Sequence, residues 1–224
     1  MSNPEFQLAA QLSSSKGLRP THDWLSSFLK TQRPTTPLQS LMQTACFRLL
    51  SSDITSTLNC DTCFPADISN SHIQERKLQG SIPVQVLGVE NISKSRWEQI
   101  EAMEAIERGE GTRGREIIRL PETEGEDGLN EGHSLRNSGM HKLLLQDASG
   151  KRAYGIELST VEGVGSSMNI GSKLLLTEVA VARGTILMVP KTVRLLGGKI
   201  ESFHKQWKEN RKAELKSSIE NQGS

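Results

Sequence analysis

Cys60 and Cys63 are the residues whose type and spacing most directly suggest chemistry. Two thiols separated by two residues can form a redox pair or supply half of a zinc site. A redox pair belongs between a strand and a helix, and a zinc site needs two more ligands. The sequence offers neither context, because Cys46 lies upstream on an expected helix and the nearest histidine is His72. We therefore interpret this pair as structural and expect no metal or other cofactor.

The remaining catalytic motifs are also incomplete. The five histidines are scattered without an HExxH pattern, and no serine lies in a Gly-x-Ser-x-Gly turn. The segment GEGTRG (109–114) resembles a phosphate loop, but it lacks the Gly-Lys-Ser/Thr ending and does not link a strand to a helix. We expect a protein that is not an enzyme, with an enzyme built on Cys60 and Cys63 as a distant alternative.

The length and composition allow one well-buried domain and a smaller one. The chain has 224 residues, of which 35% are hydrophobic and 24% are charged. No apolar run approaches the ~20 residues of a membrane helix, and the first residues lack the layout of a signal peptide. Three cysteines at irregular spacing fit a reducing compartment. These features predict a soluble intracellular protein without a membrane contact.

The first third of the chain predicts a small helical bundle. One helix begins at Pro4 and ends before Gly17, and a second runs from about Thr21 to Pro34. A third helix begins after Pro37, and a weaker pattern after Ser52 adds a short turn or helix. The third has the clearest apolar stripe, formed by Leu38, Leu41, Met42, Ala45 and Leu49. Because each helix has one apolar face, the helices must pack on one another.

From Leu78 onward the apolar period changes to two. A β-branched strand covers about 81–90, and a hairpin turns at Asp147–Gly150 before Tyr154, Ile156 and Leu158 follow at period two. Residues 171–198 predict three further short strands, with Pro190 at a strand end or edge.

Five or six short antiparallel strands fit a small closed barrel, which leaves no exposed edge. We therefore expect an α+β fold with a helical bundle over 1–75, a barrel over 76–218 and a tail over 219–224. An amphipathic helix over about 199–217 ends the barrel domain.

A small five-stranded barrel suggests the oligonucleotide/oligosaccharide-binding (OB) fold, and hence single-stranded DNA as a ligand. That function needs aromatic rings on which bases stack, and Tyr154 is the only aromatic residue between Met140 and Gly198. The cations that can still contact phosphates weakly are Lys142, Lys151, Arg152, Lys173, Arg183, Lys191 and Arg194. A protein-binding module is favoured, and a stand-alone single-stranded DNA-binding protein is the alternative.

About fifty residues, 91–139, separate the first two expected barrel strands, where a hairpin loop normally needs about 2 to 5 residues. Residues 95–109 predict a short helix, and residues 122–131 are acidic and predict disorder. Between them, arginines flank an apolar cluster of Ile117, Ile118 and Leu120. This cluster either folds back on the barrel or anchors the insert on a partner, unless the insert is a passive loop.

Three segments resemble the N-terminal region of the RecQ-mediated genome instability protein 1 family: LQGSIPVQVLGVENISKSR, HKLLLQDASGKRAYGIEL and GSKLLLTEVAVARGTILMVPKTVRLLGGKIE. The resemblance implies a helical region followed by an OB barrel in a nuclear, non-catalytic partner of topoisomerase III, a type IA enzyme. It further implies a complex with a RecQ-family helicase that dissolves double Holliday junctions. The long insert would project into the topoisomerase gate. The single barrel looks like the compact fungal form.

The resemblance is firmest at Asp147, Gly150, Gly171, Lys173, Gly197 and Gly198. It implies that Lys173 faces the topoisomerase, and it matches Trp97 and Ile100 to the start of the family's insert. The tip of the insert is assigned on its local chemistry alone. The predicted partner-binding residues are Lys173, Trp97, Ile100, Arg115, Ile117, Ile118, Arg119 and Leu120.

Overall fold

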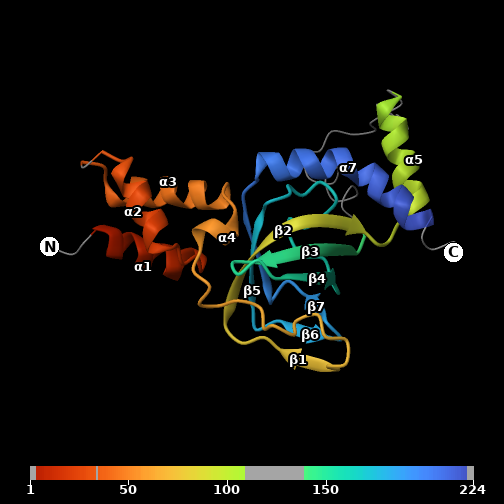
Figure 1. Cartoon of the computed structure of the whole chain (residues 1–224), viewed down its shortest axis with the longest axis horizontal. Helices are drawn as coiled ribbons and strands as arrows, with labels where there is room; N and C mark the ends of the chain where they lie inside the picture. Colours follow the sequence, from red (N-terminus) through yellow and green to blue (C-terminus); the bar gives the residue numbers. More distant parts are fainter. Residues whose placement is uncertain (1–3, 34, 109–138, 221–224) are drawn as a thin grey trace, which may run out of the picture.

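A computed structural model describes residues 4–33, 35–108 and 139–220 (Figure 1). The helices are α1 (Pro4–Lys16), α2 (His22–Lys30), α3 (Leu38–Leu50), α4 (Ile54–Thr57), α5 (Arg96–Glu107) and α7 (Glu201–Glu220). The strands are β1 (Glu75–Lys77), β2 (Ser81–Asn91), β3 (His141–Asp147), β4 (Arg152–Glu157), β5 (Lys173–Thr177), β6 (Ala180–Ala182), β7 (Thr185–Met188) and β8 (Val193–Gly197). The predicted α+β class is confirmed. The C-terminal helix runs slightly later than predicted.

The N-terminal helices pack into a bundle with its own apolar core. The Thr21 hydroxyl accepts a hydrogen bond from the Trp24 N–H and caps α2, as a residue of this type does at a helix start. On α1 the buried residues are Leu8 and Leu12. The Phe6 side chain is 74% exposed, so the face of α1 that enters the core is the one that carries Leu8 and Leu12.

The strands form one sheet in the order β1-β6-β7-β4-β3-β2-β5-β8. Strands β7 and β8 follow each other directly in the chain, separated by only four residues that include Pro190. They therefore act as two halves of one broken strand, and the chain itself closes the ring β7-β4-β3-β2-β5-β8. Proline stands at a strand break, as predicted, because it cannot donate a ladder hydrogen bond.

Two expectations about the strands need correction. Residues 173–197 form four strands and not three, because β6 and β7 make a separate small hairpin that also holds β1. The barrel is not wholly antiparallel, since β4 and β7 pair in parallel. A parallel pair requires a long crossover, and the described chain between β4 and β7 supplies it.

Strand β2 is shared by two pairings, one with β3 and one with β5. Its register with β3 shifts between Val86 and Gly88, which marks a β-bulge. The bulge adds one residue and resets the alternation, so Val86 and Val89 are both buried although they are three positions apart.

The helical bundle covers part of the outer face of β2, β5 and β8, and glycines permit the close approach. Gly197 and Gly198 both have positive φ, 87° and 97°. A Cβ at Gly198 would lie 2.2 Å from the carbonyl oxygen of Leu50 at the end of α3, whereas a Cβ at Gly197 would meet nothing within 4 Å. A glycine is thus required at position 198 both because its φ is positive and because a side chain would collide with the helical bundle.

We predict that Gly198→Ala destabilises the protein more than Gly197→Ala. Each variant is penalised for positive φ by about 1–2 kcal/mol, and Gly198→Ala also forces the bundle away from the barrel, at a cost of about 1–3 kcal/mol. Urea unfolding of the two variants measures the difference. Equal midpoints would contradict the contact.

Candidate partner-binding surface at the root of the insert

The two ends of the insert meet at one end of the barrel. The Ile92 N–H donates to the Met140 carbonyl at 2.9 Å, and the Met140 N–H donates to the Ser93 hydroxyl at 2.7 Å. The Ser93 N–H in turn donates to the Asn91 side-chain oxygen at 2.9 Å. The chain therefore leaves and re-enters the barrel through a hydrogen-bonded turn whose ends are fixed to each other.

A buried polar layer lies directly inside this turn. Asn91 pairs with His141 in the register of β2 with β3, and the Glu157 carboxylate of β4 is bonded to His141, so the three residues link the ends of β2, β3 and β4. His141 and Glu157 are each 1% exposed. One Glu157 oxygen lies 2.6 Å from Nδ1 of His141 and accepts the backbone N–H of the same residue, and the other oxygen accepts the Val161 N–H. Each of these hydrogen bonds is directional, so together they fix the positions of the strand ends.

An exposed apolar row lies on the opposite face of the same strand ends. Ile92 is hydrogen-bonded to Met140, and Leu158 follows directly after the end of β4, two residues beyond Ile156, which pairs with Lys142. Their exposed fractions are 42%, 44% and 54%. We call Ile92, Met140 and Leu158 the root face. Neighbouring large apolar side chains left in water are typical of a protein-interaction surface.

Helix α5 is the first element of the insert, and side-chain hydrogen bonds fix its first turn. The Glu98 N–H donates to the Ser95 hydroxyl, and the Ser95 N–H donates to the Glu98 carboxylate, at 3.1 and 2.8 Å. This reciprocal pair is a capping box. The hydrogen bonds from the Ser95 backbone and side chain hold the pKa of the Glu98 carboxyl below its usual value. Helix α5 therefore has a defined first turn on which the insert continues.

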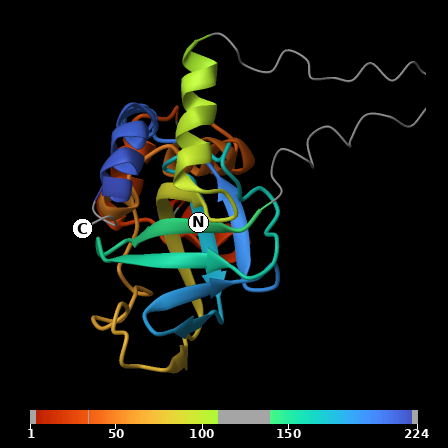
Figure 2. The same cartoon turned by 90° about the vertical axis from the view of Figure 1, so that its right-hand side faces the viewer.

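Helix α7 fixes the direction of α5. Arg211 of α7 donates to the Val89 carbonyl at 2.7 Å and to the Gln99 side-chain oxygen at 3.1 Å, so it links β2 to α5. Farther along, Lys212 pairs with Glu107 and Glu104 at 2.6 and 3.2 Å. Figure 2 shows α5 rising beside α7 from the end of the barrel. The insert thus starts along an axis set by the C-terminal helix.

The predicted partner-binding residues of the insert differ in how accessible they are. Trp97 is 67% exposed on the first turn of α5, where a partner can reach it. Ile100 is 1% exposed and belongs to the packing of α5, so it is not available as a contact. Arg115, Ile117, Ile118, Arg119 and Leu120 lie outside the described residues.

The expected exposure of Lys173 is wrong. Its side chain is 1% exposed, and Nζ donates to the carbonyls of Gly171 and Leu50 at 2.7 and 3.3 Å. Burial lowers its pKa to about 7, and the nearby Asp53 opposes this shift. Lys173 lies on the outer face of β5, but the helical bundle covers that face. Its role here is to anchor the bundle to the barrel.

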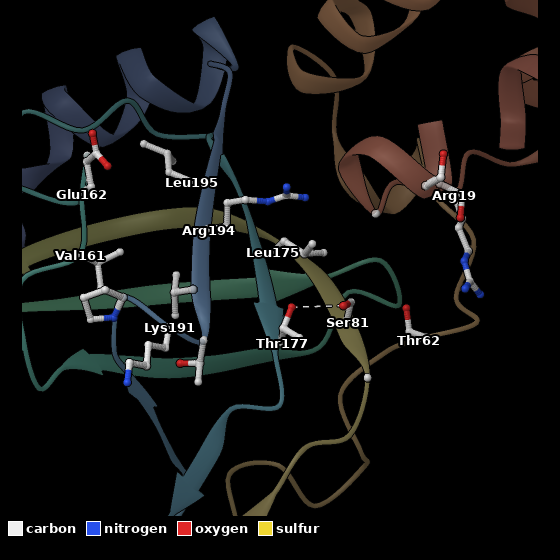
Figure 3. Close-up of a pocket in the computed structure, with 18 residues that line it drawn as sticks. Arg19, Thr62, Ser81, Val161, Glu162, Leu175, Thr177, Lys191, Arg194 and Leu195 are labelled. Atoms are coloured by element: carbon white, nitrogen blue, oxygen red, sulfur yellow. Dashed lines mark hydrogen bonds between the residues drawn. The ribbon is translucent and has the colours of Figure 1, made fainter. Parts of the chain in front are cut away.

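A large groove lies beside this junction, between the end of α1 and the strands β5 and β8 (Figure 3). Its volume is about 1150 Å³, and its floor includes Leu175 and the hydrogen-bonded hydroxyls of Ser81 and Thr177. Arg194, which lies opposite Leu175 in the register, projects into it, while Glu162 lies on the other side. Three cations, Arg19, Lys191 and Arg194, and one carboxylate, Glu162, line this groove.

The outer face of β3 and β4 corresponds to the face that binds oligonucleotides in many OB folds. Here it presents Tyr154, whose ring lies 4.1 Å from Nζ of Lys142. Tyr154 and Leu158 point outward, and the inward residues at this part of β4 are Ala153 and Glu157. Part of the face is occupied by α7, because the Trp207 indole would lie 3.5 Å from a Cβ at Gly88. One exposed ring makes a weak stacking surface.

The three cysteines are not paired, and the surroundings of Cys63 do not activate its thiol. Cys46, Cys60 and Cys63 are free thiols, and burial together with the negative charge of Asp147 raises the pKa of Cys63. A raised pKa disfavours the nucleophilic thiolate. Within residues 4–33, 35–108 and 139–220, no group of three or more His, Cys, Asp or Glu side chains is placed to hold a metal ion. Nor does this part of the chain contain a helix that is long and apolar enough to cross a membrane.

The architecture defines a class of protein: a helical bundle joined to an OB barrel, with a long insert between the first two barrel strands. Models of this architecture match the chain in two parts. "RMI1, N-terminal helical domain" covers residues 12–57, and "RMI1, N-terminal OB-fold domain" covers residues 64–211. RecQ-mediated genome instability protein 1 of Schizosaccharomyces pombe is 30% identical, over 85% of this chain and 86% of its own length. The chain belongs to the RecQ-mediated genome instability protein 1 family, as the sequence resemblance predicted.

We predict that Lys173→Glu destabilises the whole protein by several kcal/mol. The new carboxylate is buried against two carbonyl oxygens and close to Asp53, and an unpaired buried charge costs about 3–5 kcal/mol. Lys173→Met keeps the length and removes the charge, so it is the matched control and is much milder. Urea unfolding followed by circular dichroism measures both. A Lys173→Glu protein as stable as Lys173→Met would show that the side chain is not buried.

The depressed pKa of Lys173 also predicts a pH dependence. The unfolded side chain titrates near 10.5 and the folded one near 7. Between these pH values the unfolded state binds more protons than the folded state, so the free energy of unfolding rises with pH in this window. Below about pH 7 the destabilisation caused by burying this amine is at its full value. From pH 7 to 9, wild type should gain about 2–3 kcal/mol relative to Lys173→Met. Parallel stability curves for the two proteins would contradict the shift.

Proposed function

We propose that this protein is a non-catalytic accessory and scaffold subunit of a nuclear complex of topoisomerase III with a RecQ-family helicase. The barrel docks on the topoisomerase, and the insert modulates its gate during decatenation and the dissolution of double Holliday junctions. The observation that carries the proposal is the root of the insert. There, both ends of a long segment are anchored together beside an exposed apolar face.

The root face supplies binding energy in a fixed place. Fully burying a side chain of this size is worth about 1.5–3 kcal/mol, and Ile92, Met140 and Leu158 each have roughly half of that still to gain. The turn beneath them is already ordered by hydrogen bonds to Ser93 and Asn91. A partner therefore loses little free energy to ordering this surface on binding.

The insert then acts without chemistry of its own. A segment that binds a topoisomerase only when the gate is open shifts the gate equilibrium by its difference in affinity for the two states. Helix α5, held by Arg211 and Lys212 of α7, sets the direction in which the insert leaves the barrel. The name of the fission yeast relative supports a role in the RecQ pathway and in genome stability.

We predict that the double variant Met140→Glu, Leu158→Glu binds topoisomerase III at least about tenfold more weakly, because two carboxylates would be desolvated in the interface. Phe6→Glu is the control, since Phe6 is also an exposed apolar residue but lies on α1. Binding is measured by biolayer interferometry with purified topoisomerase III. An unchanged dissociation constant for the double variant would exclude the root face from the interface.

Replacing residues 110–131 by a Gly-Ser linker of equal length should leave topoisomerase binding intact and impair decatenation. The docking surface remains, whereas the side chains that distinguish the gate states are lost. Unaltered decatenation would refute the role of the insert.

The alternative of a stand-alone DNA-binding protein predicts sub-micromolar binding of single-stranded DNA by the isolated chain at physiological salt, which the same protein preparation tests.

A further inference from the structure

The helical bundle carries an aromatic pocket on its surface, at the edge of its own apolar core. Trp24 and Phe28 of α2 stack with their ring centroids 5.4 Å apart, and Phe47 of α3 lines the same pocket. The pocket has a volume of about 350 Å³ and also includes Thr31 and Arg48. We call these five residues the aromatic groove.

Phe47 is the unexplained member of the groove. The side of α3 that enters the bundle core carries Leu41, Ala45 and Leu49, and the Phe47 side chain is 72% exposed. An exposed phenyl ring gives no burial energy to the fold. Next to a partly exposed Trp24, it instead provides a rigid apolar contact of the kind enriched at interaction hot spots.

Arg48 gives the groove a charge. Its guanidinium lies 5.4 Å from the centroid of the Phe28 ring, and Nη1 donates to the Thr31 hydroxyl at 3.1 Å. Among the residues that the structure describes, no carboxylate forms an ion pair with Arg48, and none lines the groove. The guanidinium is therefore held over a ring by neutral contacts, with its charge uncompensated.

We propose that the aromatic groove binds an acidic amphipathic peptide segment of a partner protein. An apolar side chain of the peptide inserts between Trp24 and Phe47, and a carboxylate one helical turn away pairs with Arg48. A guanidinium already oriented by Thr31 and Phe28 loses little freedom when it donates hydrogen bonds to such a carboxylate, and Arg–carboxylate pairs are directional. Apolar anchors beside a charged rim are the usual features of helix-in-groove recognition.

This groove is separate from the surface assigned to the topoisomerase. In Figure 1 the helical bundle and α5 lie at opposite ends of the molecule. The two surfaces can therefore be occupied at once, and neither inference depends on the other.

The test uses a labelled 14-residue peptide with Leu and Phe at helical spacing and Glu elsewhere, and a second peptide with Lys in place of each Glu. Fluorescence anisotropy with the full chain should show at least about tenfold tighter binding of the acidic peptide. Arg48→Glu should reverse this preference. Phe47→Ser should weaken both peptides, whereas Phe6→Ser, an equally exposed residue that does not line the groove, should leave both unchanged.

Each contrary result overturns the proposal. The proposal is wrong if the acidic peptide does not bind, if Phe47→Ser does not weaken its binding, or if Arg48→Glu does not alter the preference for the acidic peptide. Circular dichroism confirms that the variants are folded, which is expected because Phe47 and Arg48 are exposed. Sedimentation of the chain alone tests another occupant. A dimer that Phe47→Ser dissociates would assign the groove to a second copy and contradict a separate partner.

Discussion

The double pairing of β2 is the constraint on which the rest of the structure depends. Eleven residues, Ser81–Asn91, bond to β5 along the first half and to β3 along the second. The first half turns Gln85 outward, where its amide oxygen accepts the Ile54 N–H and orients the helical bundle. After the bulge, the second half ends in Asn91, which holds the turn at the root of the insert. One strand thus fixes the bundle, the barrel and the insert relative to each other.

Buried polar groups determine how these parts are oriented. Asp147 is fully buried, and its carboxylate accepts N–H groups from Phe64, at 2.6 Å, and from Lys151, at 2.9 Å. It therefore attaches the segment before β1 to the hairpin of β3 and β4. Lys173 does the same between β5 and the end of α3. Apolar contacts alone allow small rotations of one packed surface on another, whereas a buried charge that loses its partner costs several kcal/mol, so these groups select one orientation.

The local features of the fold were predictable from sequence, and the features that depend on distant segments were not. The turn at Asp147–Gly150 and the break at Pro190 follow from local backbone chemistry. Lys173 was expected to face the topoisomerase from the family resemblance, and no local pattern in the sequence shows that the helical bundle covers the outer face of β5. The root face could not be read from sequence either. Ile92, Met140 and Leu158 are far apart in the chain and come to the same end of the barrel only because β2, β3 and β4 pair side by side.

Few interactions set the direction in which the insert leaves the barrel. The ion pairs of Lys212 and Lys216 with Glu104 and Glu107 lie at the surface, and pairs of this kind contribute little to stability and weaken with salt. The hydrogen bonds of Arg211 to Val89 and Gln99 are partly buried, so salt screens them less. They tie α5 to the same strand that orients the bundle. The direction of the insert is therefore a property of the barrel itself, and a partner that binds the root face meets a segment whose starting direction is already set.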